Sequence, residues 1–121
     1  MAPHPPYELY WDTPSDALDR VQFEHVVEQL VTALDSWRDA SLLDHDVQWL
    51  VYRLWFAING EGGPVIEGLD KSEEDVIASL YYNVDGMTET EFPWSHSDRS
   101  DALSTIRTDA QSLAEQVTRK R

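Results

Sequence analysis

The chain has 121 residues and no cysteine, and its 23 acidic residues against 9 basic ones give a formal net charge of −14. A surface this negative repels nucleic-acid phosphates and anionic membranes, and it attracts basic protein surfaces or cations. The absence of cysteine excludes a disulfide scaffold, a thiolate zinc site and a cysteine nucleophile. The length predicts a single domain, residues 1–121, and an apolar fraction of 41% is enough to build a core.

The N-terminal segment, residues 1–12, is rich in proline and aromatic residues. Its prolines disfavour a helix, so we expect an irregular lead whose aromatic rings pack onto the body of the protein. The segment lacks the basic and apolar runs of a secretory signal. The longest apolar stretch, residues 47–58, is too short to cross a bilayer and contains Arg53. We therefore expect a soluble, cytoplasmic protein that has no contact with a membrane.

The first predicted helix covers residues 14–39. Thr13 followed by Pro14 is typical of a helix start, because the threonine hydroxyl caps free N–H groups and proline fits the first turn. Apolar residues then recur at alternating spacings of four and three, which places them on one side of a helix. They are Phe23, Val27, Leu30, Leu34 and Trp37.

A second helix is predicted over residues 44–59. Its sequence is almost wholly apolar and is richer in leucine and aromatic residues than in β-branched ones, which favours a helix over a strand. Asn59 followed by Gly60 is a typical helix end. We expect this helix to be the most buried of the protein, with four residues in the core: Trp49, Leu50, Leu54 and Ile58.

Two further helices are predicted over residues 72–84 and 98–118. Ser72 would cap the first of them, with Asp75 closing a capping box, and Ser97 would cap the second. The last helix has apolar residues at spacings of three and four from Leu103 to Val117. The predicted fold class is all-α, a single-domain bundle of about four helices.

The sequence contains no recognisable catalytic, metal-binding or cofactor-binding motif. Its four histidines are far apart and lack the spacing of helical metal sites. The glycine-rich residues 60–63 are followed by Pro64 and include Glu61, unlike a phosphate-binding loop. Neighbouring carboxylates are common, and two groups of them, residues 44/46 and residues 73–75, are explained as helix N-terminal acids. We therefore predict a protein that is not an enzyme and that uses no cofactor.

A row of acids on the first predicted helix is the leading candidate for partner binding. The spacings of four, seven and four place its members on one side of the helix, opposite or flanking the apolar stripe. They would pair with arginine or lysine of a partner, and the alternative is an ordinary solvated face. The row consists of Glu24, Glu28, Asp35 and Asp39.

The loop over residues 87–97 is the second candidate. Glu89 and Glu91 precede Trp94, and an aromatic side chain surrounded by charge is typical of an interface hot spot. The alternative is that Trp94 folds back onto the core.

These observations favour a small acidic interaction protein that binds a basic protein surface, as immunity proteins, antitoxins and nucleic-acid mimics do. They predict no direct binding to nucleic acid. One alternative is a salt-adapted helical subunit that forms a homo-dimer and carries its acids for hydration only. Another is an enzyme or metal-binding protein whose site is not visible in the sequence.

Overall fold

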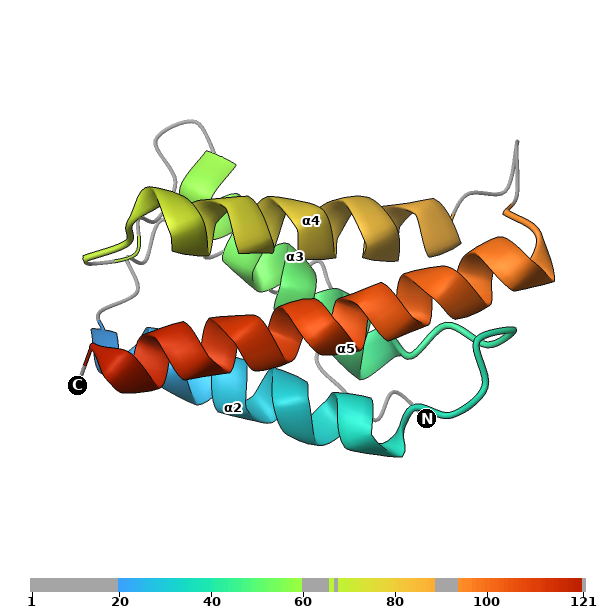
Figure 1. Ribbon diagram of the computed structural model, residues 1–121, viewed down its shortest axis with the longest axis horizontal. Helices are drawn as coiled ribbons and strands as arrows, with labels where there is room; N and C mark the ends of the chain where they lie inside the picture. Colours follow the sequence, from blue (N-terminus) through green and yellow to red (C-terminus); the bar gives the residue numbers. More distant parts are fainter. Residues whose placement is uncertain (1–19, 60–65, 67, 89–93, 121) are drawn as a thin grey trace.

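The computed structural model describes residues 20–59, 66, 68–88 and 94–120. Within these residues the chain forms an all-α bundle, as predicted (Figure 1). The four helices are α2 (Arg20–Ser36), α3 (His45–Asn59), α4 (Lys71–Met87) and α5 (His96–Arg119). The predicted irregular lead, residues 1–12, and the predicted helix start at Thr13 lie outside the described residues.

The helices pack in a ring in which each one contacts its neighbours. The most extensive contact joins α4 to α5, and further contacts join α2 to α5, α3 to α4 and α2 to α3. In Figure 1, α4, α5 and α2 run across the view one below the other, and α3 passes behind them at an angle. None of the described helices combines the length and the apolar character needed to cross a membrane.

The core is built from the apolar stripes that the sequence predicts. The predicted residues of the first helix from Phe23 to Leu34 are all buried in α2, and Trp37 is buried just after its end. In α5 the predicted stripe is buried over its whole length, from Leu103 to Val117. Burial of such stripes is the main source of stability in a helical bundle.

Helix α3 has the most extensive burial, because no side chain from residue 47 to residue 58 is exposed. Leu50 and Leu54 are in the core as predicted. Trp49 and Ile58 are only half-buried and pack against its edge, so the prediction was wrong for these two. Trp49 lies on the opposite side of α3 from Leu54, and Ile58 is in the last turn, where the core ends.

The helix caps differ from the predicted ones. Asp70, not Ser72, caps α4, and its carboxylate accepts a hydrogen bond from the Glu73 N–H while the Glu73 carboxylate accepts one from the Asp70 N–H. Asp75, predicted to close this box, instead forms an ion pair with Lys71. At α5, the hydroxyl of Ser95, not Ser97, accepts from the Asp98 N–H.

Glu73, in the first turn of α4, is completely buried. Its carboxylate accepts two hydrogen bonds from Arg20, at 2.6 and 3.2 Å, and one from Lys120 at 2.8 Å. Burial raises the pKa of Glu73, but the hydrogen bonds from the two cations outweigh it, so that the pKa lies below the ordinary value. Through these contacts Glu73 connects the start of α2, the start of α4 and the end of α5.

A second set of polar contacts fixes the connection between α2 and α3. Arg99 of α5 donates to the Ala40 carbonyl oxygen at 2.9 Å and to the Met87 carbonyl oxygen at 2.7 Å. Arg107 donates to the carbonyl oxygen of Trp37, whose indole N–H in turn donates to the Leu42 carbonyl oxygen. Arginine side chains of α5 therefore provide the hydrogen bonds that carbonyl groups beyond the end of α2 need.

Candidate functional site

The acidic row predicted on the first helix is only partly present. Glu24, Glu28 and Asp35 lie on one side of α2, beside its buried stripe; Glu28 and Asp35 are exposed and Glu24 is half-buried. Asp39 is not part of the row, because α2 ends at Ser36. The row on α2 therefore consists of three carboxylates.

Asp39 has a local structural role. Its carboxylate accepts hydrogen bonds from the hydroxyl and the backbone N–H of Ser41, at 2.6 and 2.9 Å. These bonds, first the one from the hydroxyl, lower the pKa of Asp39. The turn after α2 therefore already uses this carboxylate.

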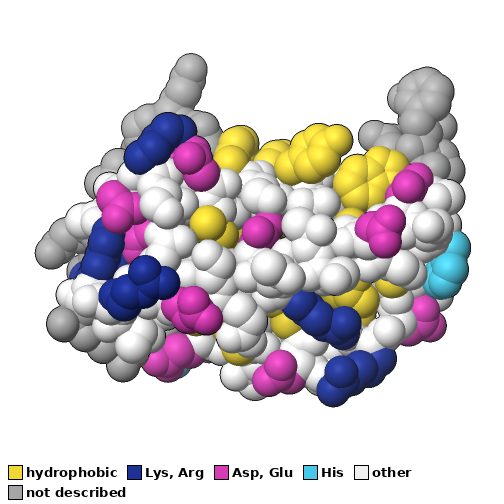
Figure 2. All heavy atoms as spheres, in the orientation of Figure 1, with side chains coloured by type: hydrophobic (Ala, Val, Ile, Leu, Met, Phe, Trp, Pro, Cys, Tyr) yellow, Lys and Arg dark blue, Asp and Glu magenta, His cyan; other side chains and the backbone are white. Residues whose placement is uncertain are grey.

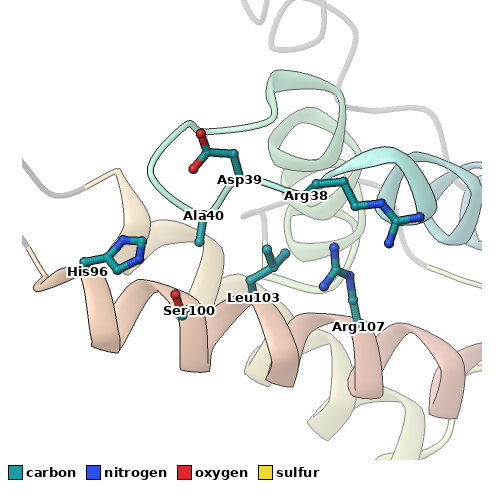
Figure 3. Close-up of a pocket in the computed structure, with 7 residues that line it drawn as sticks. All are labelled: Arg38, Asp39, Ala40, His96, Ser100, Leu103 and Arg107. Carbon is teal, nitrogen blue, oxygen red and sulfur yellow. The ribbon is translucent and has the colours of Figure 1, made fainter.

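An open hollow of about 400 Å³ lies between this turn and α5 (Figure 3). Arg38, Asp39 and Ala40 line it from the turn. Four residues line it from α5: His96, Ser100, Leu103 and Arg107. Figure 3 shows side chains of both charge signs spread around the hollow. Two of the lining residues hold the turn in place, since Asp39 bonds to Ser41 and Arg107 bonds to Trp37. The hollow is therefore bounded by side chains that already have a structural role.

Trp94 packs back onto the bundle. It is half-buried against the core, and its ring lies over Gly86, where a Cβ atom would be only 2.1 Å from Cζ2 of the indole. Its centroid is 6.0 Å from that of the Tyr82 ring, with 54° between the ring planes. Of the two alternatives predicted for Trp94, the structure shows the one in which this side chain folds back onto the core. The two acids predicted with it, Glu89 and Glu91, lie outside the described residues.

Trp94 nevertheless forms one wall of a surface groove of about 290 Å³, which we call the α4–α5 groove. The other residues that line it are Tyr82, Asn83, Asp98, Asp101, Ala102 and Thr105. Tyr82 is 69% exposed, and both carboxylates are exposed. In the described part of the chain, neither Asp98 nor Asp101 takes part in a side-chain hydrogen bond or an ion pair. Figure 2 shows hydrophobic and acidic side chains side by side where α4 ends and α5 begins.

This groove was not predicted from the sequence, which places Asp98 and Asp101 in the first turn of the last predicted helix, where acids are favourable. The available signal was the spacing from Asp98 to Asp101 and on to Thr105, which places all three on one side of a helix. Tyr82 gave no such signal, because it reaches the groove from another helix.

The charges of the described residues are distributed unevenly between contacts and solvent. Eleven of the fifteen carboxylate side chains are exposed, whereas only four basic residues are exposed. Three of those four are paired with acids: Lys71 with Asp75, Arg119 with Glu115, and Lys120 with Asp70. The fourth is Arg38. The surface of the described residues therefore carries many more exposed acidic side chains than basic ones.

The described residues contain no cluster of three or more acidic or histidine side chains arranged to hold a metal ion. No known protein family, curated protein or solved structure matches the chain.

Proposed function

We propose that the protein is a small acidic interaction module that binds a basic protein surface, in the manner of an inhibitor. The observation that carries this proposal is the charge distribution: eleven exposed carboxylates face solvent beside four exposed basic residues, three of them already paired. Such a field accelerates encounter with a positively charged partner and disfavours nucleic acid and other acidic surfaces.

The side of α2 that carries Glu28 and Asp35 is the proposed contact face. Both side chains are exposed and project from a regular helix, so they can approach a flat partner surface without rearrangement of the backbone. Each pair with a partner cation at the rim of an interface contributes only about 0.2–1 kcal/mol. Several pairs together raise the association rate, and this gain falls as salt screens the charges.

The test is capture of partners from the native lysate on the immobilised protein. Binding is carried out at about 0.05 M salt and elution at about 0.5 M, where the screening length is several-fold shorter. Wild type is compared with Glu28→Lys/Asp35→Lys and with a matched control, Glu74→Lys/Glu115→Lys. The control makes the same change in net charge at two other exposed positions.

We expect wild type to retain basic proteins that salt releases, and the α2 variant to lose them to a greater extent than the control does. Equal recovery by all three proteins would remove the α2 face from consideration. Recovery of the chain alone would contradict the proposal and favour the salt-adapted homo-dimer.

A further inference from the structure

The lining of the α4–α5 groove combines aromatic rings and carboxylates. It includes the rings of Tyr82 and Trp94, whose centroids are 6.0 Å apart, and the side chains of Asp98 and Asp101. Exposure of an aromatic ring to water, as for Tyr82, costs free energy, and two neighbouring carboxylates repel each other. A single ligand group that is both flat and positively charged would cover the exposed ring and reduce the repulsion between the carboxylates.

We propose that the α4–α5 groove is a binding site for an arginine side chain of the partner. The guanidinium group is planar and permanently charged, and it stacks on aromatic rings while donating hydrogen bonds to carboxylates. The rings would receive its face, and the carboxylates of α5 would receive its N–H groups. A lysine ammonium has no planar face to stack, so the groove discriminates between the two basic side chains.

The dimensions of the groove fit this occupant. Its volume of about 290 Å³ is at the lower limit of the roughly 300–1,000 Å³ typical of pockets for small organic ligands. A space of this size is suited to one long side chain that enters from the surface. The groove is also preformed, because Trp94 is fixed against Gly86 and Ser95 caps α5 directly beside it. Binding therefore requires little ordering of the site.

This inference deepens the proposed function, on which it rests for the identity of the partner as a basic protein. It assigns one anchoring contact to a place that is separate from the acidic side of α2. A partner that used both would present a cationic surface and one protruding arginine. The two contacts are tested independently, since the groove can be probed with a defined compound.

The experiment is a titration of the purified full chain with N-acetylarginine amide, followed in amide and indole nitrogen–proton correlation spectra at about 0.15 M salt. The lysine and citrulline analogues are the comparison compounds, since the first keeps the charge and the second keeps the shape without the charge. The indole signal of Trp94, identified with Trp94→Phe, reports on the ring wall. The backbone signals of Asp98 and Asp101 report on the acidic wall.

We expect the arginine compound to shift the Trp94, Asp98 and Asp101 signals along one saturating curve, with weaker binding of the lysine compound and none of the citrulline compound. Tyr82→Ala and Asp98→Asn/Asp101→Asn should each weaken the binding by roughly 2- to 5-fold per contact removed. The control Glu74→Gln/Glu115→Gln changes the net charge by the same amount as the double aspartate change and should leave the affinity unchanged. Each variant is first checked for native helix content.

Three results would overturn the groove proposal: no shift at Trp94, equal shifts with the citrulline compound, or equal affinity in the aspartate variant and its control. Shifts confined to α2 would also overturn it while leaving a basic partner for that face. Conversely, a groove that binds arginine in a protein that captures no basic partner would contradict the proposed function and leave this site standing.

Discussion

Replacing Glu73 by glutamine should be among the most destabilising conservative changes in the bundle. The substitution keeps the size of the side chain and an oxygen that can accept from the Asp70 N–H, so the helix cap is retained. It removes the negative charge that holds Arg20 and Lys120. At the meeting point of α2, α4 and α5, Arg20 then loses its ion pair with Glu73, and Lys120 keeps only the pair with Asp70.

The magnitude follows from the exposure of the partners. Removing one member of a fully buried ion pair costs about 3–5 kcal/mol, mostly because the remaining charge stays buried. Here the side chains of Arg20 and Lys120 are 21% and 33% exposed, so both recover part of their hydration. We therefore expect Glu73→Gln to lower the free energy of unfolding by about 2–3 kcal/mol. The neighbouring control Glu74→Gln is exposed and should change it by less than about 0.5 kcal/mol.

The assay is urea unfolding at neutral pH, followed by the circular dichroism of the helices, with the midpoint and the slope compared between variants. The pH dependence provides a second readout. The pKa of Glu73 is lower in the folded protein than its ordinary value of 4.5. Its stabilising contribution is therefore fully present above pH 4.5 and is lost as the pH falls through the folded-state pKa. The difference between wild type and Glu73→Gln should shrink over that range, and coincident midpoints of Glu73→Gln and Glu74→Gln at neutral pH would refute the reasoning.

Two further changes test the packing beside the groove and the hold on the α2–α3 connection. Gly86→Ala should lower the free energy of unfolding by about 1–2 kcal/mol, because the new Cβ atom would clash with the Trp94 ring. This cost outweighs the stabilisation that alanine gives relative to glycine within a helix. A more stable variant in urea unfolding would show that the ring is not held against Gly86. Arg99→Met should cost about 1–3 kcal/mol, since the carbonyl oxygens of Ala40 and Met87 lose a charged donor. The matched Arg119→Met removes only an exposed pair and should be near neutral in the same urea unfolding measurement.

The sequence was sufficient to predict the helices and the core because both depend on local periodicity. The stripe from Phe23 to Leu34 repeats with the helical period, and the structure buries it as predicted. The same reasoning failed for Trp49, because α3 is apolar all round and its periodicity does not say which side faces the core.

The start of α4 shows where local patterns become ambiguous. Two possible caps lie two residues apart, Asp70 with Glu73 and Ser72 with Asp75, and each has an acid three residues after the capping residue. Contacts distant in sequence favour the first, since Arg20 and Lys120 meet at Glu73. No window of sequence around α4 contains that information.

The candidate sites show the same limit. The side of α2 was predictable, because Glu24, Glu28 and Asp35 belong to one helix. The α4–α5 groove was not, because Tyr82 and Asp98 come from two helices whose relative placement is set by packing. Trp94 was recognised as notable, but its neighbours are the acids that follow it in the chain.

The charged residues of the two signs have different roles in this protein. Arginines such as Arg20, Arg99 and Arg107 bond to groups of the fold, whereas most carboxylates face water. Substitutions among the exposed acids are therefore expected to alter the net charge with little effect on the packing of the bundle. The few buried or bonded charges, by contrast, mark the positions at which a change of charge would disturb the fold.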